Sequence, residues 1–233
     1  MRIGVITAMD KEYALVRELL DGVTETESAA GKYAAGKLGA GDIILHACGI
    51  GKVNAAVGTA HMITEYMPDA VVSTGVAGGA SVSVDVGDVV ASSRTCYHDV
   101  YCGADAAYGQ VIGMPAVFDT DGRLLAAASA LHCGTTIRTG LTVTGDWFVD
   151  TRTKMREIAE MFPDAVAVDM ESAAIAHVCR RYGVPFISFR IISDVPLKDH
   201  GAKQYFDFWR TAAASSFEVT RAFLNTIITE KLF

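Results

Sequence analysis

Short apolar runs with strand character alternate with helical patterns from one end of the chain to the other. This alternation is the strongest constraint on the fold, because strands separated by helices are typical of an α/β sheet with crossover helices. Strands are predicted at residues 2–9, 33–38, 42–48, 70–74, 88–97, 136–144, 165–168 and 186–192. Helices are predicted at residues 10–20, 52–66, 124–131, 151–162, 171–182 and 206–232.

Two connections refine this picture. The strands at residues 33–38 and 42–48 are separated by a tight Gly-Ala-Gly turn, which predicts an antiparallel hairpin and therefore a mixed sheet. Residues 99–121 and 195–205 are rich in Gly, Pro and Asp and have no periodic pattern. Loops of this length in a compact domain are commonly lids or binding loops, so we expect both to cover a pocket.

Composition excludes several classes of protein. With 233 residues and 51% hydrophobic side chains, the chain can bury one large core, and we expect a single domain over residues 1–233. The net charge of -7 without a basic run argues against nucleic acid as a partner. The chain enters an apolar strand without a signal-peptide pattern, and no apolar run approaches the roughly 20 residues that span a bilayer. We therefore expect a cytoplasmic protein that is not bound to a membrane.

The cysteines and histidines predict neither a disulfide framework nor a metal site. The five cysteines are an odd number without a CxxC pair, and they lie in apolar segments where a reduced thiol behaves as a small hydrophobic group. The six histidines do not cluster with cysteines at the spacing of zinc ligands. We expect no metal and no other cofactor.

Ligands of open α/β sheets bind beyond the carboxyl ends of the strands, so the residues that follow each predicted strand are the first candidates for a site. These segments contain carboxylates, glycines and an aromatic side chain, which suit a pocket for a flat polar ligand. They are Met9 and Glu12, residues 49–51, residues 74–79, residues 145–148, residues 169–171, and Ser193 with Asp194.

Three other kinds of site, namely a P-loop, a dinucleotide-binding loop and a serine-hydrolase nucleophile, fit the sequence poorly. The segment at residues 31–37 matches part of a P-loop, but Leu38 replaces the hydroxyl that binds Mg²⁺ and a strand follows where a helix is needed. The segment Gly49-Ile-Gly51 resembles a dinucleotide fingerprint, but Asn54 stands at the third glycine. No GxSxG sequence is present, so a serine hydrolase has no positive signal.

A series of motifs spans nearly the whole chain. Together, and in this order, they resemble the bacterial 5'-methylthioadenosine/S-adenosylhomocysteine nucleosidases of the nucleoside phosphorylase superfamily. The motifs are GVITAM at residues 4–9 followed by Glu12, GIGKVNAA at 49–56, TGVAGG at 74–79, YHD at 97–99, TGD at 144–146, VDMESAAIA at 168–176 and ISDV at 192–195.

The resemblance implies a three-layer αβα fold around a mixed, partly closed sheet, and a homodimer. It implies hydrolysis of methylthioadenosine and adenosylhomocysteine, and of 5'-deoxyadenosine as a further candidate, to adenine and the substituted ribose. Glu12 would activate the water and Asp194 would protonate adenine at N7. Glu171 would hold the ribose hydroxyls beside Met170, Phe148 would stack on the base, the Val149 backbone would read its edge, and Arg190 would help to hold Glu12 and the water. Met9, Ile50, Val76, Gly78, Ser193 and Phe206 would complete the substrate pocket.

The chemistry of the reaction agrees with these roles. Cleavage of an N-glycosidic bond passes through an oxocarbenium-like sugar, so it needs an acid for the leaving group and a base for water. The apolar residues before Asp194 are expected to raise its pKa, so that it can donate a proton near neutral pH. Glu171 opens a predicted helix, and the helix dipole is expected to keep it ionised.

Each residue also has a structural interpretation by itself. Glu12 could be a first-turn carboxylate that answers the helix dipole, Asp194 a turn residue before Pro196, and Phe148 part of the core. All of these residues occur together and in the family's order, which favours their role in a site over the separate structural interpretations.

Two positions depart from the family: Val76 stands where serine is usual, and Asp169 where glutamate is usual. The alternatives are a related purine nucleosidase such as a futalosine hydrolase, a nucleoside phosphorylase, and a binding module without turnover.

Overall fold

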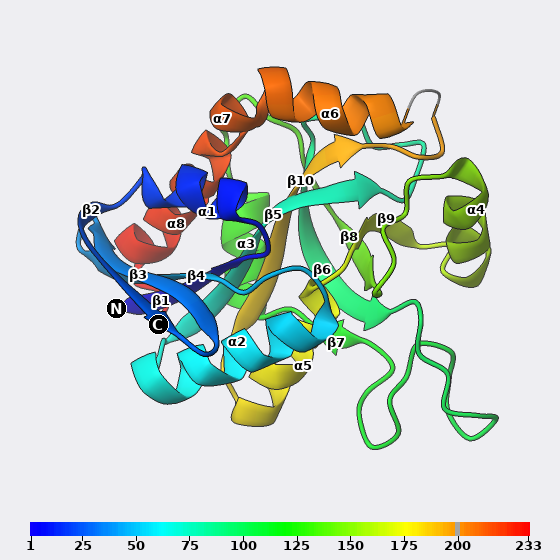
Figure 1. The fold of residues 1–233 in the computed structure, drawn as a ribbon, viewed down its shortest axis with the longest axis horizontal. Helices are drawn as coiled ribbons and strands as arrows, with labels where there is room; N and C mark the ends of the chain where they lie inside the picture. Colours follow the sequence, from blue (N-terminus) through cyan, green and yellow to red (C-terminus); the bar gives the residue numbers. More distant parts are fainter. Residues whose placement is uncertain (199–200) are drawn as a thin grey trace.

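The structure, a computed structural model, describes residues 1–198 and 201–233. Within these residues one ten-stranded mixed sheet forms the centre of the molecule (Figure 1). Its main path runs in the order β10-β6-β8-β9-β5-β1-β4-β3-β2, with β7 paired to β6. The strands are β1 (Arg2–Thr7), β2 (Asp21–Ser28), β3 (Gly31–Leu38), β4 (Gly41–Ala47), β5 (Ala70–Gly79), β6 (Val89–Tyr97), β7 (Phe118–Asp119), β8 (Ile137–Thr144), β9 (Ala165–Asp169) and β10 (Phe186–Asp194).

The sheet closes on itself at one end. Strand β10 pairs in parallel with β5 and antiparallel with β6, so that β10, β6, β8, β9 and β5 form a ring. The other end stays open, where β4, β3 and β2 form antiparallel pairs. The predicted mixed, partly closed sheet is therefore confirmed, and so is the hairpin of β3 and β4.

Helices cover both faces of the sheet (Figure 1). The apolar cluster on one face includes residues of α2 and α5, and the cluster on the other face includes residues of α1, α3 and α8. Helix α4 packs beside β8 and β9. The helices are α1 (Asp10–Arg17), α2 (Lys52–Tyr66), α3 (Gly122–Ser129), α4 (Arg152–Met161), α5 (Ser172–Tyr182), α6 (Gly201–Thr211), α7 (Ala213–Ser216) and α8 (Glu218–Glu230).

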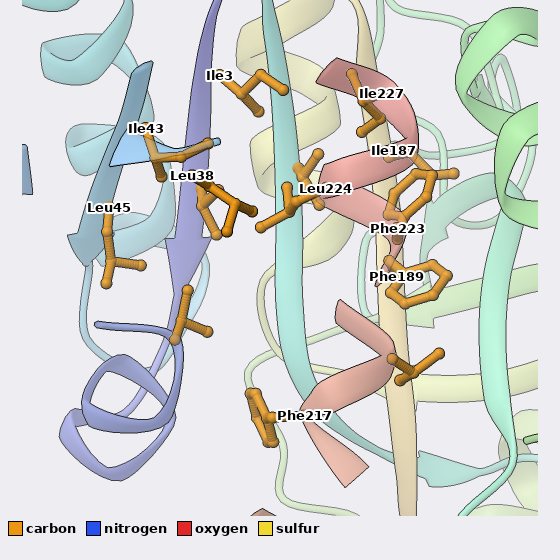
Figure 2. Close-up of a cluster of buried hydrophobic side chains, with 14 of the residues drawn as sticks. Ile3, Leu38, Ile43, Leu45, Ile187, Phe189, Phe217, Phe223, Leu224 and Ile227 are labelled. Atoms are coloured by element: carbon orange, nitrogen blue, oxygen red, sulfur yellow. The ribbon is translucent and has the colours of Figure 1, made fainter. Parts of the chain in front are cut away.

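The largest apolar cluster lies between the sheet and α8 (Figure 2). Phe189 of β10 stacks on Phe223 of α8 with ring centroids 4.5 Å apart, and both side chains are fully buried. All nine residues of β10 are buried, as expected for a strand that is covered on both faces. The strand that carries Arg190 and Asp194 is thus held rigidly by the core.

The prediction missed one long strand and misjudged the C-terminal helix. Strand β2, with the sequence DGVTETES, was not predicted, because its side chains are mostly exposed polar groups without an apolar face. The predicted helix at residues 206–232 is wrong in its extent: the structure has three helices, α6, α7 and α8. The breaks near Ala212 and Phe217 allow Phe208, Phe217 and Phe223 to enter one core, whereas a straight helix of that length would run about 40 Å.

The two predicted lid segments have some regular structure. Residues 99–121 contain the short strand β7, and the predicted loop at residues 195–205 overlaps the start of α6. Asp199 and His200 of that loop lie outside the described residues. Among the described residues, no helix has both the length and the apolar character needed to cross a bilayer.

Candidate active site

A cavity lies beyond the carboxyl ends of β1, β4, β5, β8, β9 and β10, the rim that the strand pattern predicted. It brings together twelve of the thirteen side chains that the sequence singled out, although they come from six separate segments of the chain. Its lining residues are Ala8, Met9, Glu12, Ile50, Val76, Ala77, Gly78, Trp147, Phe148, Val149, Val168, Asp169, Met170, Glu171, Arg190, Ser193, Asp194 and Tyr205.

Glu12 is buried in the first turn of α1 and is held by backbone amides. Its Oε2 accepts hydrogen bonds from the amides of Ala8 and Met9, both at 3.0 Å, and its Oε1 accepts one from the amide of Val76 at 2.8 Å. Burial raises the pKa of Glu12 above its ordinary value, while the charge of Arg190 and the three amides oppose this rise. The result is a fixed carboxylate that can still accept a proton from a water molecule in the cavity.

Gly75 explains how Glu12 reaches this position. Its φ of +137° is unfavourable for any residue with a side chain, and a Cβ atom there would lie 2.5 Å from Oε1 of Glu12. It would also lie 2.9 Å from Nη1 of Arg190. A glycine at this position therefore lets β5 approach both charged groups closely.

Asp194 ends β10 on another side of the cavity. The pairing between β10 and β5 shifts by one residue between Ile192 and Asp194, and this irregularity places Asp194 opposite Gly78. The Ser193 hydroxyl donates a hydrogen bond of 2.7 Å to Oδ1 of Asp194. Burial raises the pKa of Asp194 to about 6, and the bond from Ser193 opposes the rise. A carboxyl with this pKa is partly protonated near neutral pH and can act as an acid.

Glu171 lies at the start of α5 and is bound on both oxygens. The Gly51 amide donates to Oε1 at 3.0 Å, and Nη2 of Arg190 lies 3.5 Å from Oε2. Burial raises the pKa of Glu171, and the nearby charge of Asp169 raises it further, although Arg190 and the Gly51 amide oppose both effects. The expectation that Glu171 is kept readily ionised is therefore wrong, because burial of the carboxyl raises its pKa.

Arg190 and Asp169 form a buried ion pair in the wall of the cavity. Nε of Arg190 lies 3.1 Å from Oδ2 of Asp169, and Nη2 donates to the Ser73 hydroxyl at 2.9 Å. Asp169 also accepts hydrogen bonds from the hydroxyls of Thr144, at 2.6 Å, and Ser172. Arg190 thus ion-pairs directly with Asp169 and Glu171. Its positive charge also opposes the rise in the pKa of Glu12 that burial causes. The aspartate that departs from the family pattern serves as the main anion for Arg190.

The aromatic wall of the cavity differs from the prediction at one residue. Phe148 lines the cavity and is 56% exposed, so a face of the ring is open to a ligand. Phe206 does not line the cavity and is 71% exposed, whereas Tyr205 lines it and contacts the Phe148 ring edge-on at 5.6 Å. Neighbouring positions on a helix point about 100° apart, and here Tyr205 is the one that faces the cavity.

Six lining residues had no role in the prediction: Ala8, Ala77, Trp147, Val168, Asp169 and Tyr205. Trp147 and Asp169 follow predicted strands, so their position near the site was indicated by the expectation that ligands bind beyond the carboxyl ends of strands. Tyr205 lay at the end of a predicted loop, where no periodicity could assign its direction. Among the described residues, no group of three or more His, Cys, Asp or Glu side chains is arranged to hold a metal ion.

The raised pKa of Asp194 predicts the pH dependence of the reaction if this residue is the acid. The acid must be protonated, so kcat/KM should fall as the pH rises through about 6. Replacement of Ser193 by alanine removes a bond that favours the charged carboxylate, so this fall should move to higher pH. A pH profile of kcat/KM for both proteins measures the effect. A falling limb at the same pH in both would contradict the assignment.

Comparisons with known proteins show the family to which the chain belongs. The profile described as the phosphorylase superfamily matches residues 2–227. The 5'-methylthioadenosine/S-adenosylhomocysteine nucleosidase of Anoxybacillus flavithermus is 40% identical over 231 residues, which are 97% of this chain and 99% of the relative.

Two solved structures have the same fold. The nucleosidase of Neisseria meningitidis in complex with methylthio-immucillin-A is 38% identical, with a TM-score of 0.89 over 96% of this chain and 98% of that chain. The nucleosidase of Colwellia psychrerythraea in complex with adenine is 36% identical, with a TM-score of 0.88 over 97% of this chain and 95% of that chain. The chain therefore belongs to the 5'-methylthioadenosine/S-adenosylhomocysteine nucleosidase family of the phosphorylase superfamily, as its motifs predicted.

Proposed function

We propose that this protein hydrolyses the N-glycosidic bond of 5'-methylthioadenosine and S-adenosylhomocysteine and releases adenine. The observation that carries the proposal is the pair of buried carboxyl groups in one cavity, Glu12 from α1 and Asp194 from β10. Hydrolysis at the anomeric carbon needs a proton donor for the base and a proton acceptor for water on the opposite face of the sugar. Relatives that share most of the chain carry this activity in their names.

In the proposed mechanism the base lies against the exposed face of Phe148 and receives a proton from Asp194 at N7. Departure of adenine then leaves positive charge on the sugar. Glu12 takes a proton from the attacking water, and its three backbone amides keep the carboxylate in place. Glu171 accepts hydrogen bonds from the ribose hydroxyls, while the Gly51 amide and Arg190 orient it.

The lining of the cavity favours water over phosphate as the nucleophile. Among the described lining residues, Arg190 is the one cation, and it already pairs with Asp169 and Glu171. Val76 lies beside Glu12 and offers an apolar side chain where the family usually has a hydroxyl. A phosphate dianion would therefore enter without a free cation to bind it, close to a carboxylate that repels it.

A substrate panel with and without phosphate tests this proposal. Methylthioadenosine and adenosylhomocysteine should release adenine at rates that phosphate does not raise, with free thioribose as the second product. 5'-Deoxyadenosine, adenosine, inosine and futalosine complete the panel. Liquid chromatography of the products distinguishes hydrolysis from phosphorolysis. Turnover that depends on phosphate and yields a ribose 1-phosphate would overturn the proposal, as would a clear preference for futalosine.

We also propose a homodimer in the cytoplasm. Helix α2 carries exposed apolar side chains at Val53 and Val57, and the segment after β6 exposes Tyr101 and Ile112. Such apolar surface favours an interface with a second copy. The five free thiols suit a reducing compartment. The mass of the protein in solution, measured by light scattering, tests the dimer, and a monomer at micromolar concentration would contradict it.

A further inference from the structure

A compact charged cluster lies beside the cavity without lining it. Lys52 at the start of α2, Asp99 after β6 and Asp146 after β8 come from three segments that are far apart in the sequence. Their side chains are 22%, 27% and 46% exposed, so the lysine and one aspartate are mostly covered. None of the three is among the residues that line the cavity. The proposed chemistry does not use them.

The three side chains are tied together by ionic and backbone hydrogen bonds. Nζ of Lys52 donates to both carboxylate oxygens of Asp99, at 2.7 and 2.6 Å, and lies 3.8 Å from Oδ2 of Asp146. Asp146 accepts a hydrogen bond of 2.8 Å from the backbone amide of Lys52 and so binds the first turn of α2. Its own amide donates to Asp99 at 2.8 Å. The cluster therefore fixes the backbone of two segments as well as their side chains.

Each of these two segments leads directly to a different part of the cavity. Gly51, next to Lys52, has a φ of +101° and donates its amide to Oε1 of Glu171. A Cβ atom at Gly51 would lie 3.1 Å from Asp146, so this backbone packs tightly on the cluster. On the other side, Asp146 is followed by Trp147, Phe148 and Val149, which all line the cavity.

We propose that Lys52, Asp99 and Asp146 form a positioning clamp that sets the spacing between the ribose site at Glu171 and the base site at Phe148. The proposal rests on the proposed function, because it assigns these two sides of the cavity to the sugar and the base. A nucleoside binds well only when both sides are in register, so the clamp acts on substrate affinity. Glu12 and Asp194 are held by other contacts, namely the amides of residues 8, 9 and 76 and the hydroxyl of Ser193.

The test compares Lys52→Met with Lys52→Arg and with a control, Lys37→Met. Lys37 also pairs with an aspartate at 2.6 Å, but the pair is exposed and lies at the turn between β3 and β4. Lys52→Met should raise KM for methylthioadenosine by about tenfold and change kcat by less than about threefold. Lys52→Arg keeps the charge and should recover most of the affinity. Lys37→Met should leave both constants unchanged.

Asp146→Asn provides a second variant with nearly unchanged volume. It keeps an oxygen for the Lys52 amide but removes the charge, so it should also raise KM. In the double variant with Lys52→Met the two increases should combine to less than their product, because both break the same clamp. Hydrogen exchange adds a readout that does not depend on turnover: the Gly51 amide should exchange faster in Lys52→Met than in the wild type.

The outcomes separate the two proposals. A loss of thermal stability in Lys52→Met without a change in KM would mean that the cluster is only structural, and would overturn the clamp. A fall in kcat at constant KM, or unchanged exchange at Gly51, would overturn it as well. If the wild type released no adenine, the proposed hydrolysis would fail, and the clamp would then be judged by Gly51 exchange and by the affinity of each variant for intact methylthioadenosine, which spans both sides of the cavity.

Discussion

Replacement of Asp194 by asparagine is expected to lower kcat for adenine release from methylthioadenosine by about 10²- to 10⁴-fold, the range that general acid catalysis supplies. Asparagine has nearly the same shape, and its oxygen can still accept the hydrogen bond from Ser193. It cannot release a proton to the base. The cavity should keep its form, so the dissociation constant for methylthioadenosine should change by less than about threefold by calorimetry.

A substrate with a better leaving group makes this experiment decisive. A riboside whose leaving group departs without protonation bypasses the acid, so Asp194→Asn should cleave it at nearly the wild-type rate. Asp42→Asn, a change in an exposed ion pair with Lys37 at the turn between β3 and β4, serves as the control and should have normal activity. Near-normal adenine release by Asp194→Asn would refute the assignment of the acid.

Replacement of Glu12 by glutamine should produce a loss of similar size by a different route. Glutamine cannot accept a proton from water, which removes general base catalysis worth about 10²- to 10⁴-fold. It also carries an NH₂ group in place of one carboxylate oxygen, while three backbone amides already point at this side chain. At least one buried donor then lacks an acceptor, so the side chain should also move from its wild-type position.

The two variants are distinguished by the leaving group. The riboside that rescues Asp194→Asn should not rescue Glu12→Gln, because attack by water still needs the base. Single-turnover measurements of both variants with both substrates give the comparison directly. Glu218→Gln, an exposed change in α8 that breaks only a surface pair with Arg221, is the matched control. Rescue of Glu12→Gln by the activated riboside would show that Glu12 is not the base.

The order of helices and strands could be predicted well wherever apolar periodicity is strong. Helix α2 has the predicted bounds, because glycine precedes it and Pro68 follows it. Strand β10 is rich in apolar residues from Phe186 to Ile192 and was equally clear, although the structure extends it to Asp194. Strand β2 could not be predicted, since it is a polar edge strand that depends on pairing with β3. The breaks between α6, α7 and α8 also depend on distant partners, because they serve to pack three phenylalanines into one core.

The site was predicted in its position and only partly in its electrostatics. Glu12, Glu171 and Asp194 meet in one cavity because the strands that precede them end at the same rim. The raised pKa of Asp194 followed from its apolar neighbours in the chain, but that of Glu171 did not. The burial of Glu171 comes from segments that meet it only after folding, and the charge of Asp169, two residues earlier in the chain, adds to the rise in its pKa. A helix-dipole argument includes neither effect.

The sequence by itself determined the family, the alternation of strands and helices, and the rim on which the carboxylates stand, because these depend on local pattern and on the order of motifs. The tertiary structure alone decided that Arg190 pairs with Asp169 and Glu171, that Tyr205 faces the cavity while Phe206 does not, and that Lys52 joins Asp99 and Asp146. Contacts of this kind depend on the direction of side chains and on desolvation between distant segments. Side-chain directions and desolvation are set only when the sheet has closed and the helices have packed against it.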